Sequence, residues 1–218
     1  MNDLTTLNII FLVLSLLISG YFAGLVGMPL GPIRIFFMLF FGVNALIVFG
    51  TNLAISFVMM IPTVWNNLKH QRIDFRKGIL FIISGGIIGP FFGGIISESF
   101  SQSILLLIVT VLIIVSGLFI VQAVHFPRKK SIEIDRSNKD FIASFLNLII
   151  GALGSSVGMV LGALRYPVMI NFLRTEAKSA GAINSFINLI FALFGLIGHL
   201  LASQESGNSH FDLYLFLP

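Results

Sequence analysis

Cysteine is absent from this 218-residue chain, and charged residues are scarce. The missing cysteines exclude disulfide bonds, thiolate metal sites and a cysteine nucleophile. Only 10% of the residues are charged, whereas a soluble domain usually has about 25%. Arg34 is the single charged residue between Asp3 and Lys69. Such a chain cannot cover a water-facing surface with charge, and we exclude a soluble globular protein.

Recognisable catalytic motifs are also missing. The sequence contains no helical pair of metal-binding histidines, no GxSxG elbow and no P-loop. We therefore expect no enzymatic activity, no cofactor and no metal. An ATP-driven pump would need a partner chain that brings the ATPase.

Long apolar runs dominate what is present: 56% of the residues are hydrophobic, and the mean hydropathy is +1.01. A transmembrane helix needs about 20 mainly apolar residues. We therefore predict an all-α polytopic membrane protein, with spans at about 7–26, 45–65, 78–96, 104–124, 141–161 and 179–202. Glycine-rich breaks precede two short apolar segments, at about 33–41 and 165–173, which we interpret as half-helices.

Basic residues gather in two loops, 66–77 and 125–140. The positive-inside rule makes both loops cytoplasmic in a plasma-membrane protein. It also explains the net charge of +4 without a nucleic-acid partner. Residues 98–103 then lie outside, whereas simple counting of spans places the loop at 203–212 inside.

A phrase in the first half of the sequence returns in the second. Residues 18–34 (ISGYFAGLVGMPLGPIR) match 149–165 (IIGALGSSVGMVLGALR) at eight of seventeen positions. We interpret this as two four-span repeats with broken helices, at 1–124 and 141–218, joined by the basic loop at 125–140. The second repeat ends where its third span should begin, so we expect it to be truncated. We favour parallel halves, with inverted halves as the alternative.

Each matched phrase ends in an arginine within apolar sequence, Arg34 and Arg165. A charge in a membrane span is costly and usually marks a substrate path. Two guanidinium forks beside half-helix N-termini suit a small oxyanion. The predicted substrate-binding residues are Gly27, Gly31, Arg34, Asn44, Thr51, Asn52, Gly158, Gly162, Arg165 and Asn184.

Simpler explanations compete with each part of this site. The arginines could extend to the membrane interface, and the glycines and polar residues could serve helix packing. We interpret Gly85, Gly89 and Gly93 as packing residues. His199 has no counterpart in the first repeat, and we interpret it as a packed or interfacial histidine, with a proton relay as the alternative.

Six motifs follow one another along the chain: GYFAGLVGMPLGPIR at 20–34, NALIVFGTN at 44–52, RIDF at 72–75, GGIIGPFFGG at 85–94, VGMVLGALRYP at 157–167 and AGAIN at 180–184. Their order and spacing resemble the TauE/SafE sulfite exporter (TSUP) family. The resemblance covers nearly the whole chain. It implies a secondary carrier built from two four-span repeats, with sulfur-containing anions such as sulfite, thiosulfate or organosulfonates as substrates.

Three functions remain open at this point. The first is an exporter of a small sulfur-containing anion, coupled to the proton-motive force. The second is a membrane scaffold or partner subunit without transport activity, which the expected truncation favours. The third is a passive anion channel. The expected partners are the anion, the lipid bilayer and, as an option, further copies of the chain.

Overall fold

The computed structural model describes residues 13–14, 17–18, 31–70, 79–125, 136–171 and 177–216, and these residues form helices joined by short loops, with no strand among them. The predicted all-α class is therefore confirmed. Most of the predicted first span, 7–26, lies outside the described residues. The helices are α2 (Gly31–Phe40), α3 (Ala45–Lys69), α4 (Ile79–Ile82), the π-helix η1 (Ile83–Ile88), α5 (Gly89–Ile96), the 3-10 helix η2 (Ser97–Ser99), α6 (Gln102–His125), α7 (Arg136–Ser156), α8 (Gly162–Asn171), α9 (Ala177–Ser206) and α10 (Leu213–Phe216).

Three helical stretches in the described part are long and apolar enough to cross a membrane: Ala45–Lys69, Ile79–Ser99 and Ser179–Ser206. Shorter apolar helices lie at Gly31–Phe40, Gln102–Leu118 and Asp140–Ser156. Both predicted half-helices are present, as α2 and α8, each ten residues long. The count of four spans in each repeat stays a prediction.

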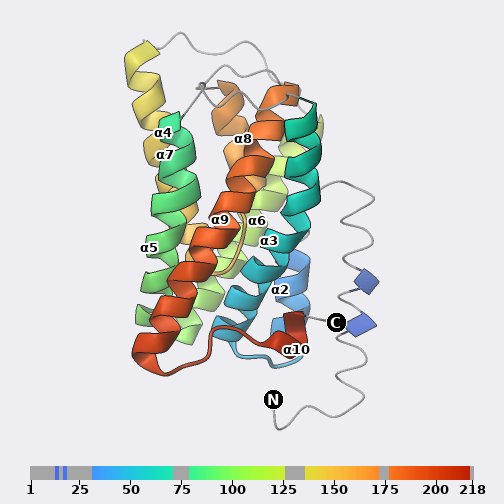
Figure 1. The fold of residues 1–218 in the computed structure, drawn as a ribbon, viewed down its shortest axis with the longest axis vertical. Coiled ribbons are helices and arrows are strands. Elements are labelled where there is room, and N and C mark those ends of the chain that lie inside the picture. The colour runs from blue at the N-terminus through green and yellow to red at the C-terminus, as the bar shows by residue number, and fades with distance from the viewer. Residues whose placement is uncertain are drawn as a thin grey trace.

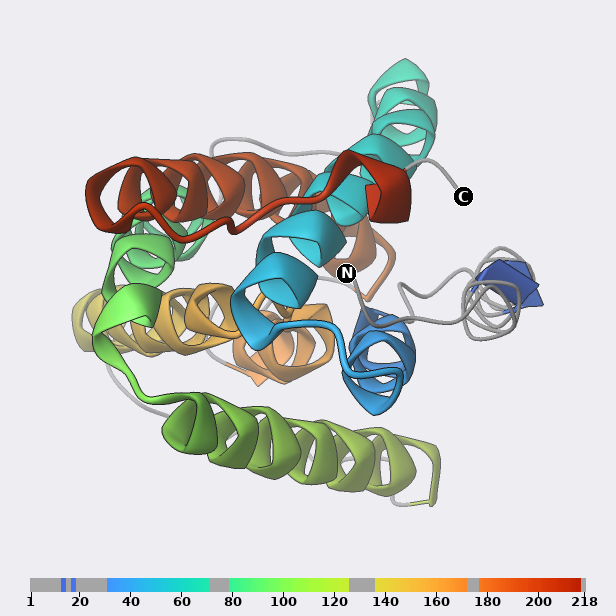
Figure 2. The same cartoon turned by 90° about the horizontal axis from the view of Figure 1, so that it is seen from below.

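Glycines allow the backbones of α5 and α7 to approach closely. A Cβ atom on Gly89 would lie 2.5 Å from the Leu148 carbonyl oxygen, and one on Gly93 would lie 2.2 Å from that of Ala152. The predicted packing role of these glycines is confirmed. Helix α6 lies at one side of the resulting bundle (Figure 2).

The two long helices that follow the half-helices, α3 and α9, pack against each other in opposite directions (Figure 1). Asn67, near the end of α3, donates to Ser185, near the start of α9, over 2.9 Å. Gly195, late in α9, faces Leu53, early in α3. Because α3 and α9 hold matching positions in the repeated sequence, the preferred parallel arrangement is wrong, and these matched helices are inverted.

Helix α8 folds back along α7 rather than continuing it. Near the break Gly154 lies against Leu161, and further away Asn147 contacts Arg165. As a result α7 and α8 together form a hairpin, and α9 then crosses the bundle. The loop after α9 thereby reaches the end occupied by η2, where Asn208 donates to Glu98. Simple counting of spans, which separated residues 203–212 from 98–103, is therefore wrong.

Two hydrophobic clusters form the core of the part of the chain that the structure describes. One joins α2, α3, α6 and the break at 157–161, with Phe49 and Met159 fully buried. The other joins α4, α7, α8 and α9, with Phe81 and Ile183 buried. Each short helix thus packs into a cluster of its own, and each brings one arginine with it.

Candidate anion-binding site

Arg34 lies on α2 with its guanidinium turned into the bundle. Its side chain is 4% exposed. Nε donates to Asn52 Oδ1 over 3.0 Å, Nη2 to Ser56 Oγ over 3.0 Å, and Nη1 approaches Met59 Sδ at 2.6 Å. All three partners lie on α3, so the pairing of α2 with α3 fixes the arginine.

Arg165 lies on α8 and is completely buried. Nε donates to Asn147 Oδ1 over 3.0 Å, and Nη1 donates to Asn188 Oδ1 over 2.6 Å. The guanidinium carbon lies 4.6 Å from the centre of the Phe191 ring, a cation–π contact. Nη2 has no hydrogen-bond partner among the described residues. The fork therefore has one donor group to offer.

Asn147 is held in place by the neighbouring π-helix. Its Nδ2 donates to the Phe81 carbonyl over 2.6 Å. A Cβ atom on Gly85 would lie 2.1 Å from the Asn147 side chain, so only glycine admits the asparagine here. Gly85 thus serves packing as predicted, and this packing also positions a partner of Arg165.

The two arginines share an electrostatic feature. Every described hydrogen-bond partner of either guanidinium is neutral. The ion pair found in the described part joins His210 to Glu98, so neither arginine has a carboxylate partner there. A buried cation without a counterion is costly. An anion that reached these groups would supply the missing charge.

Matching contacts repeat around the two arginines. Each arginine is the fourth residue of its short helix, and each helix begins at a glycine. A Cβ atom on Gly31 would lie 3.2 Å from Asn52 Nδ2, and one on Gly162 would lie 2.9 Å from Asn184 Nδ2. The sequence similarity thus corresponds to similar local packing, although Asn184 donates to the Gly162 carbonyl instead of binding the arginine.

A hydrogen bond connects the first arginine with the break in the second half. Asn52 accepts from Arg34 and also donates, through Nδ2, to the Gly158 carbonyl over 2.7 Å. Gly158 has φ of +64°, which favours glycine, and its Cα faces the Phe49 backbone. Asn52 therefore links α2, α3 and the turn between α7 and α8. The partner sets of the two arginines share no described residue.

The remaining predicted residues lie elsewhere. Thr51 Oγ1 accepts from the Asp212 backbone N–H over 3.1 Å, next to Asn52. Asn44 caps α3 by accepting from the Leu46 N–H over 2.9 Å. It lines an open depression of about 560 Å³ between α2 and α6, and neither arginine lines this depression. Gly27 lies outside the described residues.

Sequence reasoning missed five residues that contact the guanidinium groups: Ser56, Met59, Asn147, Asn188 and Phe191. Asn188 lies 132 residues after Ser56, the same separation as between Asn52 and Asn184, so an alignment of these two stretches pairs Asn188 with Ser56. Asn147 stands within the apolar run SFLNLII, where a lone polar residue is itself a signal.

Comparison with known proteins bears on the identity of this site. The sequence model described as "Sulfite exporter TauE/SafE" matches residues 11–218. The chain belongs to the TauE/SafE family. This confirms the resemblance drawn from its motifs and makes the chain a member of a family of membrane transporters.

Two curated relatives are similar to this TauE/SafE protein over most of its length. "Probable membrane transporter protein YunE" of Bacillus subtilis is 22% identical over 225 residues, covering 91% of this chain and 80% of the relative. "Probable membrane transporter protein MJ0441" of Methanocaldococcus jannaschii is 23% identical over 200 residues, covering 87% and 73%. No solved structure matches the chain.

Proposed function

We propose that the chain is a secondary transporter that exports a small sulfur-containing anion across the plasma membrane, coupled to the proton-motive force. Sulfite, thiosulfate and organosulfonates are the candidate substrates. The family and the two probable membrane transporters support transport as the general function. The description of the family supports this substrate class.

The environment of Arg165 is the single observation that best supports an anionic substrate. Its charge is fully buried, its described hydrogen-bond partners are two neutral amides, and Nη2 has no partner among the described residues. Guanidinium groups bind oxyanions through parallel hydrogen bonds. A sulfur oxyanion beside Nη2 would satisfy the remaining donors and compensate the charge.

Arg34 would serve as a second contact at another stage of transport. Its guanidinium is also buried and also lacks a described carboxylate partner. Asn52 connects it to the Gly158 carbonyl in the break of the second half. In inverted-repeat carriers such breaks lie at the substrate site near the membrane midplane, which favours passage of the anion between the two halves.

Anion flux into vesicles tests this proposal directly. The purified full chain is reconstituted, and uptake of radiolabelled sulfite, thiosulfate and ethanesulfonate is measured for wild type, Arg34→Gln and Arg165→Gln. We expect at least one anion to be moved by wild type, with a loss of about tenfold or more in each variant, since one charge-assisted hydrogen bond contributes about 1.5–3 kcal/mol.

Lys69→Gln is the matched control, because it removes an exposed positive charge at the end of α3. It should transport as wild type does. Unchanged flux in both arginine variants would refute the site. Uncoupled, electrogenic flux that ignores a pH gradient would identify a channel instead of a carrier.

A further inference from the structure

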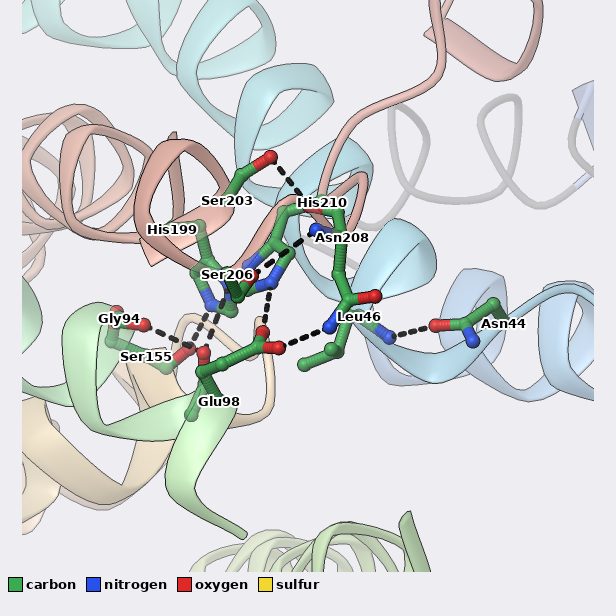
Figure 3. Close-up of polar contacts among 11 residues, drawn as sticks. Asn44, Leu46, Gly94, Glu98, Ser155, His199, Ser203, Ser206, Asn208 and His210 are labelled. Atoms are coloured by element: carbon green, nitrogen blue, oxygen red, sulfur yellow. Dashed lines mark hydrogen bonds and ion pairs between the residues drawn. The ribbon is translucent and has the colours of Figure 1, made fainter. Parts of the chain in front are cut away.

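A second polar cluster lies at the end of the bundle where η2, the end of α9 and the following segment 207–212 meet (Figure 3). It contains Glu98, His210 and His199 in a chain of contacts. His210 Nε2 contacts Glu98 Oε2, and His210 Nδ1 lies 3.1 Å from His199 Nδ1. His199 Nε2 lies 2.8 Å from the Ser155 carbonyl oxygen. The chain thus runs from η2 to the end of α7.

If all three contacts are hydrogen bonds, the chain needs one more proton than two neutral histidines provide. Each of the three contacts needs one hydrogen between its two heavy atoms. A neutral imidazole carries one N–H, so the two histidines together supply two. The Ser155 carbonyl can only accept, as can an ionised Glu98. The third hydrogen must therefore be an added proton, on the histidine pair or on the carboxyl group.

The surrounding groups do not supply that hydrogen. Ser97 Oγ lies 3.3 Å from His199 Nδ1 but donates to the Gly94 carbonyl over 2.6 Å. Asn208 donates to the other carboxylate oxygen of Glu98. The described contacts from α3 and α7 to this region come from neutral groups, Thr51 Oγ1 and the Ser155 carbonyl.

Two further carboxyl groups are close along the sequence. Asp212 lies on the same segment as His210, and its backbone N–H binds Thr51. Glu205 is exposed on the last turn of α9. The three contacts that need a hydrogen join Glu98, the two histidines and the Ser155 carbonyl, and the added proton is therefore placed among these groups.

The chain also has a route to water. Both histidines are buried, at 0% and 1% exposure, whereas the Glu98 side chain is 22% exposed. A proton can therefore arrive at Glu98 and pass inward through His210 to His199. Removing the proton leaves two hydrogen-bond acceptors facing each other, which weakens one of the three contacts.

The cluster touches the scaffold of the arginine sites at two points. The Ser155 carbonyl that faces His199 also accepts from the Gly158 N–H over 2.9 Å, at the break between α7 and α8. The His210 carbonyl packs against Gly50 of α3, two residues before Asn52. Gly158 and Asn52 are in turn joined by a hydrogen bond.

We propose that Glu98, His210 and His199 form the site that binds the coupling proton of this carrier. The bound proton holds segment 207–212 and the broken helix together, and its loss lets them separate. This inference rests on the proposed transport function and identifies the coupling ion and its ligands. The sequence offered a proton relay as the alternative role of His199. The proposal adopts this role and adds Glu98 and His210 as partners, which the sequence did not suggest.

The inference is tested by measuring proton coupling separately from the movement of the anion. Wild type, Glu98→Gln, His210→Gln and the control His70→Gln are reconstituted as full chains. His70 is exposed after the end of α3. Two quantities are measured with labelled thiosulfate and sulfite: accumulation driven by an imposed pH gradient, and exchange of anion across the membrane without a gradient.

We expect wild type and His70→Gln to accumulate anion several-fold under the gradient. Glu98→Gln and His210→Gln should lose this accumulation and keep anion exchange. Gradient-driven accumulation in both variants at the wild-type level would overturn the inference. Absence of any anion movement by wild type would instead refute the proposed function.

A second measurement does not depend on transport activity. Nitrogen-15 spectra of labelled histidines in wild type report the protonation of each imidazole across a pH range. We expect the spectra to show one proton shared between two imidazoles, and Glu98→Gln to change that signal. If no two imidazoles share a proton and Glu98→Gln changes nothing, the proton site is refuted, whatever the flux shows.

Discussion

Replacing Arg165 with lysine keeps a positive charge inside the membrane bundle but removes the planar fork. In the wild type Nε and Nη1 are engaged by Asn147 and Asn188, and Nη2 is without a described partner. A lysine ammonium is a compact charge and cannot form the same set of directed hydrogen bonds. The variant therefore separates the effect of charge from the effect of geometry.

The magnitude follows from the bonds that are lost. A hydrogen bond to a charged group contributes about 1.5–3 kcal/mol, and every 1.4 kcal/mol is a factor of about ten in affinity. Loss of one directed hydrogen bond from Nη2 to an oxyanion should therefore raise the KM for the transported anion about 10- to 150-fold. The side chain is fully buried, so screening by solvent should not reduce this effect.

The assay measures initial rates of sulfite and thiosulfate uptake into vesicles over a range of concentrations for wild type, Arg165→Lys and Lys69→Gln. The control should keep the wild-type KM, because Lys69 is exposed. A KM for Arg165→Lys within twofold of wild type would refute the reasoning, since charge alone would then suffice. Thermal unfolding in detergent verifies that both variants are folded.

Three further variants test separate parts of the structure. Asn52→Ala should reduce flux more than Ser56→Ala, because Asn52 contacts both Arg34 and Gly158; equal losses would contradict this linking role. Gly158→Ala should lower thermal stability markedly, since its Cβ would lie 2.3 Å from a backbone atom of α3 at a φ of +64°, whereas Gly117→Ala, with nothing within 4 Å of its Cβ, should not. Asn44→Ala should cost about 1 kcal/mol of stability through the lost N-cap and leave the KM unchanged; a raised KM would return Asn44 to the substrate path.

The two half-helices could be predicted because their signals are local. Glycine and proline interrupt the apolar sequence before Arg34, and glycines alone interrupt it before Arg165; such residues disfavour the continuation of a regular helix. The structure begins α2 at Gly31 and α8 at Gly162, close to the predicted segments. The direction in which each half-helix runs has no such local signal, because an apolar segment is compatible with either direction.

The partners of the arginines depend on distant parts of the chain. Asn147 reaches Arg165 only because α8 folds back along α7, and it fits there only because Gly85 lies opposite. The chain of Glu98, His210 and His199 needs η2 and segment 207–212 to share one end of the bundle. Counting of spans placed these two segments at opposite ends of the bundle, because it counted the hairpin of α7 and α8 as one crossing of the membrane.

By itself the sequence determined that this protein is helical, lies in a membrane, contains a repeated arginine phrase and belongs to the TauE/SafE family. Composition and the positions of glycine and arginine suffice for the first three conclusions, since these depend on the cost of placing polar groups in lipid. The family follows from the resemblance of the motifs, which the family model confirms. Only the tertiary structure decided that the matched helices are inverted, which amides hold each guanidinium and that two histidines meet a carboxylate. Those features depend on contacts between residues far apart in the sequence, 118 positions for Asn67 and Ser185 and 112 for His210 and Glu98, and no local pattern specifies them.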